Sequence, residues 1–263
     1  MKAILLKLLH WSTQFGFNPL VFFSSLRGAA FVVSDYVKFR IKYDGTAPLS
    51  FSMPCLSDRF SESGSINTHY FHQDLYVSQR VFELAPEKHV DIGSRVDGFV
   101  SQVASYRNVE VFDIRPLTTE IRNIKFLQAD IMEENFSVKE YCDSLSCLHA
   151  LEHFGLGRYS DPIRVDGHIR GLKNLAEILK VGGTLYLSVP IGKDRVEFNA
   201  HRIFSIDTIL KLAKPYFQFK RFSYIDDRCN FFENIDLDKD VLARENNFGC
   251  RFGCGIFEFT KLG

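Results

Sequence analysis

The stretch that decides the fold is His89-Val90-Asp91-Ile92-Gly93-Ser94-Arg95-Val96-Asp97-Gly98-Phe99, and it is followed by a second apolar run, Val109-Glu110-Val111-Phe112-Asp113. A strand ended by Gly, a polar turn, a helix-like segment and a second strand ending in an acid about 20 residues later are typical of a βαβ nucleotide site. Gly93 lets the backbone approach a ligand, and Asp113 can accept two hydrogen bonds from a ribose diol. The motif is not G-x-G-x-x-G, because Arg95 stands at the second glycine and Asp97 would repel a pyrophosphate.

The rest of the chain continues this alternation of strands and helices. Apolar runs at 125–130, 143–148 and 184–190 predict further strands, and helical periodicity predicts helices over 69–84 and 167–179. A helix over 206–212, a strand over 217–224 and a closing strand over 255–260 complete the pattern. Strands and helices alternating in this way predict an α/β fold with a doubly wound, mostly parallel sheet covered on both faces.

Several short motifs occur along these elements in a fixed order: Asp91-Ile92-Gly93, Phe112-Asp113, Gln128-Ala129-Asp130, His149-Ala150-Leu151-Glu152-His153, and Gly182-Gly183 before the fifth strand. Together they resemble a class I S-adenosylmethionine-dependent methyltransferase over residues 86–215. The resemblance implies a Rossmann-like methyltransferase fold with a seven-stranded sheet and S-adenosylmethionine as cofactor. It assigns cofactor binding to the turn and the strand-end acids, namely Asp91, Gly93, Arg95, Asp97, Asp113 and Asp130. Within that set Asp91 and Gly93 shape the methionine pocket, Asp113 holds the ribose and Asp130 faces the adenine edge.

Longer sequence motifs make the family resemblance more specific. They include His69-Tyr70-Phe71-His72-Gln73-Asp74, the run from His149 to Pro162, Phe198-Asn199-Ala200-His201-Arg202, and the run from Asn247 to Gly255. These phrases resemble an uncharacterised bacterial family, domain of unknown function number 268, which is methyltransferase-like and is commonly encoded beside genes for surface polysaccharides. The resemblance implies O-methylation of a saccharide or of a surface-polysaccharide intermediate. The alternative is a non-catalytic, methyltransferase-like binding subunit of a polysaccharide biosynthesis complex.

The candidate catalytic residues lie in two segments that leave the fourth and fifth strands at the edge where ligands bind in such sheets. Methyl transfer to oxygen needs a base near the acceptor, and His149, His153, His201 and Asp161 have side chains suited to that task. Glu152 can orient an imidazole or contact the substrate, and Arg158, Tyr159 and Arg202 are the other predicted substrate contacts. For the histidines and Glu152, a role in packing or in hydrogen bonding to loop backbone remains the alternative.

The amino-acid composition indicates which binding partners and which cellular compartment are expected for the protein. Lys and Arg equal Asp and Glu at 32 each, so no overall positive field favours a nucleic acid. Six scattered cysteines indicate reduced thiols and a cytoplasmic protein. Cys250 and Cys254 can be half of a metal site or part of a strand turn, and without a matching second pair we expect no metal. A dinucleotide-dependent dehydrogenase ranks below both functions above, because the glycine spacing is absent.

Residues 1–68 are predicted to form a helical and irregular extension, and residues 69–263 the catalytic domain. Residues 1–43 are rich in Leu and Phe and carry six Lys and Arg against the single acid Asp35. Arg27 interrupts the longest apolar run, so a membrane-spanning helix is not expected here. Two interpretations remain open, namely helices packed on the catalytic domain, or a basic amphipathic segment in peripheral contact with an anionic membrane. The oligomeric state and the acceptor are not determined by the sequence.

Overall fold

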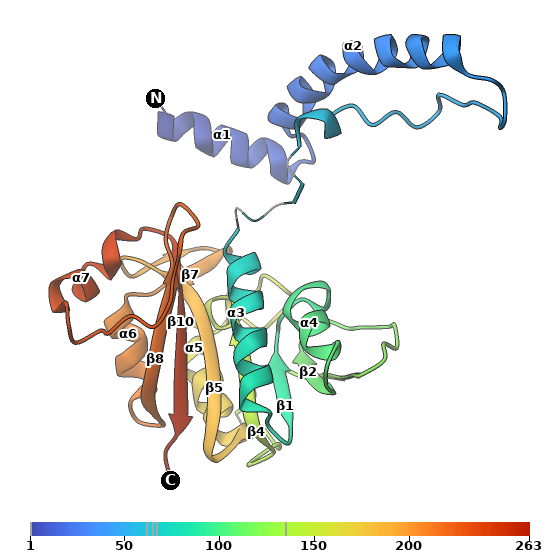
Figure 1. Cartoon of the computed structure of the whole chain (residues 1–263). Helices are drawn as coiled ribbons and strands as arrows, with labels where there is room; N and C mark the ends of the chain where they lie inside the picture. The colour runs from blue at the N-terminus through green and yellow to red at the C-terminus, as the bar shows by residue number, and fades with distance from the viewer. Residues whose placement is uncertain (1, 62, 65, 67, 135) are drawn as a thin grey trace. The chain divides into compact units, whose positions relative to one another are not determined.

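The apolar runs of the central and C-terminal sequence form one sheet of eight strands in the computed structural model, which describes residues 2–61, 63, 64, 66, 68–134 and 136–263 (Figure 1). The strand order is β3-β2-β1-β4-β5-β10-β8-β9. Strands β1 to β5 run parallel to one another, and β10 runs antiparallel to both β5 and β8. The predicted doubly wound, mostly parallel α/β fold is therefore confirmed. The sheet has one strand more than predicted, because the two-residue strand β9 pairs with β8 at the edge.

The strands are β1 (His89–Ile92), β2 (Val109–Asp113), β3 (Ile124–Gln128), β4 (Cys142–Leu148), β5 (Leu179–Ile191), β8 (Phe217–Ile225), β9 (Phe231–Phe232) and β10 (Gly253–Lys261). The separate hairpin consists of β6 (Arg195–Glu197) and β7 (His201–Ile203). Longer helices are α3 (His69–Leu84), α5 (Gly167–Ile178) and α6 (Ile206–Ala213), and α4 (Ser101–Ala104) and α7 (Val241–Glu245) are short. Single helical turns lie at Val96–Val100, Leu151–His153 and Asn247–Gly249.

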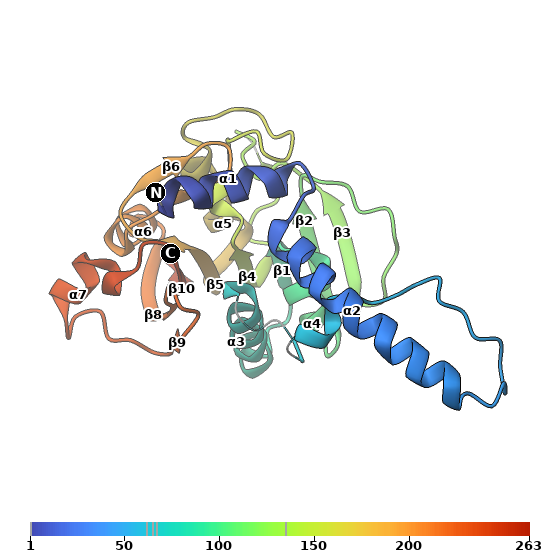
Figure 2. The same cartoon turned by 90° about the horizontal axis from the view of Figure 1, so that it is seen from above.

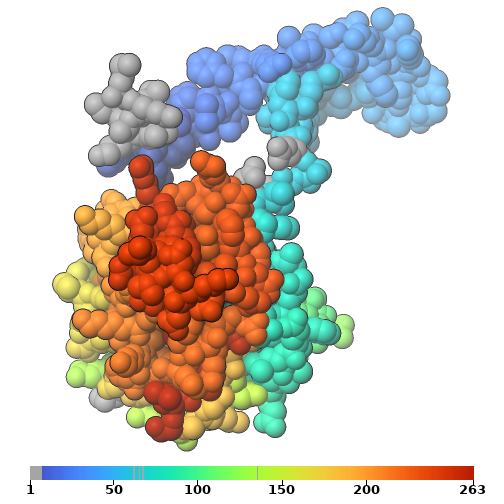
Figure 3. Space-filling model, turned by 60° about the vertical axis from the view of Figure 1, so that its left-hand side comes forward, coloured from blue at the N-terminus to red at the C-terminus, as the bar shows by residue number. Residues whose placement is uncertain are grey.

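Two apolar clusters hold helices on the two faces of the sheet. Helix α3 and the segment 96–104 contribute Val77, Val81 and Phe99 to the cluster on one face. On the other face α5 and α6 contribute Leu172, Leu175 and Ile209, which pack against Leu145 and Leu185 of the sheet. Figures 1 and 2 show α3 and α5 on opposite sides of the strands. In the view of Figure 3, the C-terminal segments from about α6 onward form most of the visible surface of residues 66–263.

The chain divides into two units by its contacts, residues 1–65 and residues 66–263, whereas the predicted boundary lies at residue 68. The first unit consists of α1 (Lys2–Gln14), α2 (Pro19–Lys42) and a single turn at Asp58–Phe60. The Asn18 side chain caps α2 by accepting hydrogen bonds from the backbone N–H groups of Leu20 and Val21.

Helix α2 is 24 residues long, has a mean hydropathy of 1.4 in its most apolar window, and buries only 6% of that window. By length and composition alone it is therefore sufficient to span a membrane. Arg27 does not lower the mean hydropathy of the window below that of a spanning helix, so the expectation that residues 1–43 do not span a membrane stays a prediction.

Candidate functional site

The turn after β1 is held open by Gly93 and by a buried acid behind it. Gly93 has a φ of +75°, and a Cβ atom there would lie 2.9 Å from Cβ of Ala150. Asp91 is fully buried, and its carboxylate accepts hydrogen bonds from the Ser94 N–H (3.0 Å), the Ser94 hydroxyl (2.8 Å) and the Ser146 hydroxyl (2.6 Å). Burial raises the pKa of Asp91 to about 7. The structure thus places Asp91 behind the turn, where it positions the backbone of Ser94, and not on the surface of the pocket.

Asp113 ends β2 beside this turn, and its carboxylate is bound by Arg115, which is not among the predicted site residues. The Arg115 Nε lies 3.0 Å and 3.1 Å from the two carboxylate oxygens, and Nη2 also contacts Oδ2. The same Nη2 donates to the carbonyl of Gly93 at 3.1 Å, and the guanidinium lies 4.7 Å from the centre of the Tyr159 ring. Arg115 therefore spans the ends of β1 and β2, where the sequence predicts the ribose.

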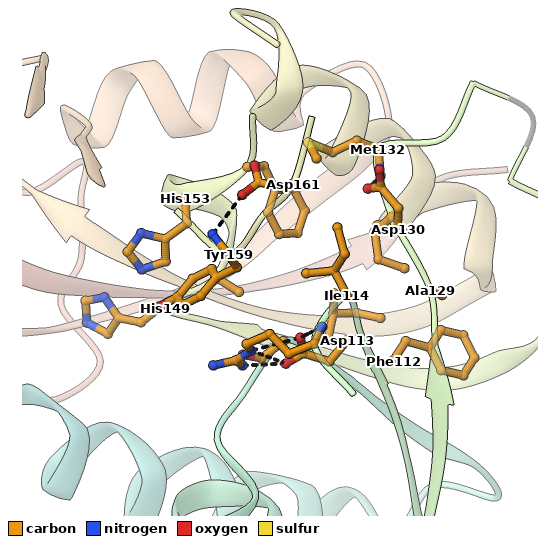
Figure 4. Close-up of a pocket in the computed structure, with 16 residues that line it drawn as sticks. Phe112, Asp113, Ile114, Ala129, Asp130, Met132, His149, His153, Tyr159 and Asp161 are labelled. Atoms are coloured by element: carbon orange, nitrogen blue, oxygen red, sulfur yellow. Dashed lines mark hydrogen bonds and ion pairs between the residues drawn. The ribbon is translucent and has the colours of Figure 1, made fainter. Parts of the chain in front are cut away.

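The pocket between these strand ends lies where the strand order reverses between β1 and β4, which is the usual ligand position in doubly wound sheets. Figure 4 shows Asp130 and Met132 at one end of the pocket and His149 and His153 at the other, with Tyr159 between them. Asp130 accepts a hydrogen bond from the Met132 N–H at 2.8 Å. Apolar side chains complete the lining, among them Ile92, Phe112, Ile114, Ile131, Met132 and Phe154.

Arg95 and Asp97 lie on the outer side of the turn and pair with each other. Their side chains are 71% and 68% exposed, and the Arg95 Nη2 lies 2.6 Å from Oδ2 of Asp97. Both line a neighbouring hollow together with Asp74 and Tyr70 of α3. The predicted repulsion from Asp97 is thus balanced by Arg95, and the net charge of this rim of the site is close to neutral.

A buried histidine–glutamate pair lies after β4. His149 Nδ1 lies 2.8 Å from Oε1 of Glu152, and the two side chains are 6% and 2% exposed. Burial opposes charge on the imidazole, but Cys254 and the Glu152 carboxylate beside it outweigh this effect and raise the pKa of His149 well above its ordinary value. The same pairing lowers the pKa of Glu152 against the effect of its burial. We infer that Nδ1 of His149 donates to the Glu152 carboxylate and that this contact favours the protonated imidazole.

His153 differs from His149 in its hydrogen bonding and in the direction of its pKa shift. Its Nδ1 lies 2.7 Å from the Ala200 carbonyl oxygen, which only accepts hydrogen bonds, so Nδ1 carries the proton and Nε2 is the basic nitrogen. Nε2 lies 3.7 Å from Oε1 of Glu152. Burial lowers the pKa of His153, and nearby Arg158 adds to this effect, so the ring is neutral at pH 7. Of the predicted bases, His153 therefore has both the tautomer and the charge state that proton removal requires.

His149 and His153 also line a second, polar cleft at the same edge of the sheet, and two further candidate site residues, His201 and Arg158, line it as well. The His201 ring packs at a tilt against Phe252 with ring centres 4.8 Å apart, and burial lowers the pKa of His201. The Arg158 Nη1 donates to the Ala200 carbonyl at 2.8 Å, and the Arg158 guanidinium lies 5.3 Å from the Tyr159 ring. The two pockets share the His149–His153 wall.

Two predicted roles need correction. Asp161 is not a free carboxylate, because it accepts hydrogen bonds from the backbone N–H groups of Gly155 (2.9 Å), Gly157 (3.2 Å) and Tyr159 (3.1 Å) and thereby shapes the loop. Arg202 is buried and donates to backbone carbonyl oxygens, including that of Phe154 at 2.6 Å. Both side chains use their hydrogen-bonding capacity on the loop that carries His153 and Tyr159, so we place them as structural supports.

The cleft also contains residues that the predicted site did not include. His69 and Tyr70, at the start of α3, lie 5.9 Å and 5.2 Å from His149 by ring centres. Burial and His149 lower the pKa of His69 to about 4. His72, one turn further along α3, stacks on Phe231 with ring centres 6.0 Å apart. The signal that could have identified His69 was its position at the helix start before β1, at the edge where the strands end.

The metal interpretation of the cysteine pair finds no support in the geometry. Cys250 and Cys254 are buried free thiols, and Cys254 packs in the core near β5 and β8. In the described part of the chain, no three His, Cys, Asp or Glu side chains are arranged to hold a metal ion.

Comparisons with solved structures agree with this architecture. The [4+2]-cyclase SpnF superposes with a TM-score of 0.52 and 12% identity, covering 91% of this chain and 97% of that protein. A putative sarcosine dimethylglycine methyltransferase from Galdieria sulphuraria has a TM-score of 0.51 and 12% identity over 73% of this chain and 86% of its own. The N-methyltransferase NodS from Bradyrhizobium japonicum, solved with S-adenosyl-L-homocysteine, has a TM-score of 0.50 and 14% identity, covering 76% of this chain and 89% of NodS.

These similarities show the methyltransferase fold, and because one of the three structures is named a cyclase, they do not by themselves fix the reaction. Among curated proteins, none matches the sequence significantly. A family model described as "Caenorhabditis protein of unknown function, DUF268" matches residues 107–250, more than half of the chain. That description names Caenorhabditis, so it gives no support to the bacterial origin expected from the sequence. The match does establish the family itself: the chain belongs to the DUF268 family.

Proposed function

We propose that this protein is an S-adenosylmethionine-dependent methyltransferase that acts on an oxygen atom of its acceptor. The observation that carries the proposal is the shared wall of the two pockets. The pocket with Gly93 and Asp113 adjoins the polar cleft through His149 and His153. A cofactor in the first pocket and an acceptor in the second would meet beside His153.

The residues of the first pocket fit a nucleoside. Gly93 keeps the turn free of side-chain atoms, Asp113 offers a carboxylate at the end of β2, and apolar side chains such as Ile114 and Met132 suit an adenine ring. Binding of a ribose diol to Asp113 requires Arg115 to give up part of its contact with that carboxylate. When bound, S-adenosylmethionine supplies a methyl group on a positively charged sulfonium.

The cleft residues supply the proton chemistry. An acceptor hydroxyl that donates to His153 Nε2 loses its proton to that nitrogen as its oxygen becomes methylated. The resulting imidazolium then lies close to the Glu152 carboxylate, which stabilises it. The Ala200 carbonyl keeps the ring in the required tautomer throughout. His201 lies in the same cleft as the second candidate base.

For the acceptor we propose a saccharide or a surface-polysaccharide intermediate. The family resemblance suggests this class, and the cleft offers suitable groups. Tyr70 and Phe252 present rings that are half and 40% exposed, on which the apolar face of a sugar can pack, and Arg158 can hydrogen-bond hydroxyl or acidic groups. We further propose a cytoplasmic location, which the free cysteines support.

The second candidate function is a non-catalytic, methyltransferase-like subunit that binds a partner in polysaccharide biosynthesis. The contact between Arg115 and Asp113 favours it, because that ion pair occupies the predicted ribose position. Arg95 and Asp97 at the usual glycine positions favour it as well.

Isothermal titration with S-adenosylmethionine, and separately with NAD, distinguishes these functions. The enzyme is expected to bind S-adenosylmethionine in the micromolar range, and Asp113→Ala is expected to weaken binding by about tenfold or more, equivalent to about 1.4 kcal/mol. Asp166→Ala is the matched control, because this exposed acid has its own partner in Arg170 and lines neither pocket. Binding of neither ligand would favour the non-catalytic subunit. Binding followed by transfer of labelled methyl to glycan acceptors would establish the enzyme and its substrate class.

A further inference from the structure

The N-terminal unit has a charge and a surface that differ from those of the rest of the chain. Residues 1–65 carry seven Lys and Arg against four Asp and Glu, a net charge of +3, whereas residues 66–263 carry 25 against 28, a net charge of −3. The neutral total therefore conceals a basic first unit. This unit also carries many of the exposed large apolar side chains of the protein.

One face of α2 is covered by the segment that returns along it. The Arg27 guanidinium lies 4.5 Å from the Phe60 ring, Asp35 pairs with Arg59, and the rings of Tyr36 and Phe51 lie 4.5 Å apart. At Gly28, which is buried, a Cβ atom would lie 1.6 Å from the carbonyl oxygen of Leu56. The charged groups in the middle of α2 thus find partners within the unit.

The opposite face of α2 carries an exposed apolar stripe, and further exposed apolar side chains of the helix, among them Leu20, Val21 and Phe39, lie outside it. The stripe consists of Phe22, Leu26, Ala30, Val33, Val37 and Ile41, whose spacings of four, four, three, four and four residues place them on one side of a helix. Leu26 is 56% exposed, Val33 54%, Val37 51% and Ile41 79%. Lys38, Arg40 and Lys42 lie in the last turns of the same helix and are exposed. An apolar stripe with basic residues at its end is typical of a helix that lies in the interface of an anionic membrane.

We propose that α2 docks this stripe on an anionic lipid surface, with its axis in the plane of the membrane. A spanning orientation is disfavoured because residues 50–57 are irregular chain beside the helix, and unpaired backbone groups cannot enter the hydrocarbon region next to lipid. In the interfacial orientation, the stripe enters the lipid, while the returning segment and the pair that its Arg59 makes with Asp35 of α2 stay in water. The proposal is independent of the proposed methyl transfer, since it concerns residues outside the strand-end pockets.

Flotation of the full-length protein with vesicles tests the proposal. The protein is expected to float with vesicles of phosphatidylcholine mixed with phosphatidylglycerol, and to float much less with phosphatidylcholine alone or at high salt. The variant Leu26→Glu/Val33→Glu is expected to bind the anionic vesicles about tenfold more weakly or worse, because it places two charges in the stripe. The matched control, Phe82→Glu/Leu242→Glu, adds the same charge at exposed sites of the other unit and should bind like the wild type.

A second variant keeps the stripe and removes the positive charge. Lys38→Gln/Arg40→Gln/Lys42→Gln should lose the preference for phosphatidylglycerol while its circular dichroism stays unchanged. Three outcomes would overturn the proposal. The first is equal vesicle binding by the stripe variant and the wild type, and the second is resistance of the membrane-bound protein to alkaline carbonate, which indicates a spanning helix. The third is a wild-type dimer that does not bind vesicles and that the stripe substitutions convert to a monomer, which assigns the stripe to a second copy of the chain.

Discussion

Two acid–cation pairs in the site, Asp113–Arg115 and Glu152–His149, each join residues that are close together in the sequence, but the pairs differ in burial. Arg115 is 36% exposed at its side chain, whereas His149 and Glu152 are 6% and 2% exposed. A pair at the mouth can exchange its partner for a ligand, because water solvates the arginine when it leaves. A buried pair cannot, because separating it would leave an uncompensated charge. The difference indicates that Asp113–Arg115 responds to ligand binding, while Glu152–His149 is a permanent part of the site.

The largest effect is expected for Glu152→Gln, which removes the buried negative charge next to two histidines. The free energy of unfolding should fall by about 3 kcal/mol, since one partner of a buried pair is lost. Methyl transfer should fall at least as far as in the His153 variant below. Urea unfolding and a methyltransferase assay measure both quantities, with the half-exposed Glu197→Gln as control. A variant as stable as the wild type would show that the pair is not charged.

The next largest effect is expected for His153→Gln. Loss of the general base should lower kcat by about 10²–10³-fold without changing the affinity for S-adenosylmethionine. His168→Gln, which changes a histidine outside the cleft, should retain kcat. Because burial lowers the pKa of His153, the wild-type rate should be constant near pH 7 and should fall only below the ordinary histidine pKa of about 6.5. Full activity of the His153 variant would transfer the role to His201.

A third test concerns His89, which is buried like His149 but has no acid in contact. His89 lies between the hydroxyls of Ser144 (2.8 Å) and Ser146 (3.1 Å), and burial lowers its pKa to about 3. Between about pH 6.5 and 3 the unfolded chain binds a proton at this position and the folded protein does not, so acid should destabilise the fold by about 1.4 kcal/mol per pH unit. Unfolding of His89→Gln at pH 7 and pH 5 should show that this part of the pH dependence is lost. An unchanged dependence would mean that His89 becomes charged in the folded state.

The smallest effect is expected for Arg115→Ala. Removing the guanidinium frees Asp113, so the affinity for S-adenosylmethionine should rise by a few-fold, less than the tenfold that about 1.4 kcal/mol represents. Titration calorimetry measures this change, and Arg170→Ala, an arginine that is also paired with an acid but lies outside both pockets, serves as control. Weaker binding by Arg115→Ala would instead make Arg115 a contact of the cofactor.

The local elements and the position of the site were predictable from the sequence. Helix α3 covers the predicted residues, and the strands that end at Asp113 and Leu148 end where the apolar runs stop. The periodicity of the apolar residues and the residues that end each apolar run carry this information, because they reflect burial of the local chain. Helix α2 is longer and more apolar than the run interrupted by Arg27 suggested.

What the sequence by itself determined is therefore the order of strands and helices, and with it the edge of the sheet at which Gly93, Asp113, His149 and His153 gather. Only the tertiary structure decided what each side chain does there. It turned Asp91 and Asp161 toward backbone and hydroxyl donors, and it set the tautomer of His153 through a carbonyl 47 residues away. The physical reason is that hydrogen bonds and ion pairs depend on distances of a few ångströms between segments remote in the chain, and local sequence patterns do not encode those distances.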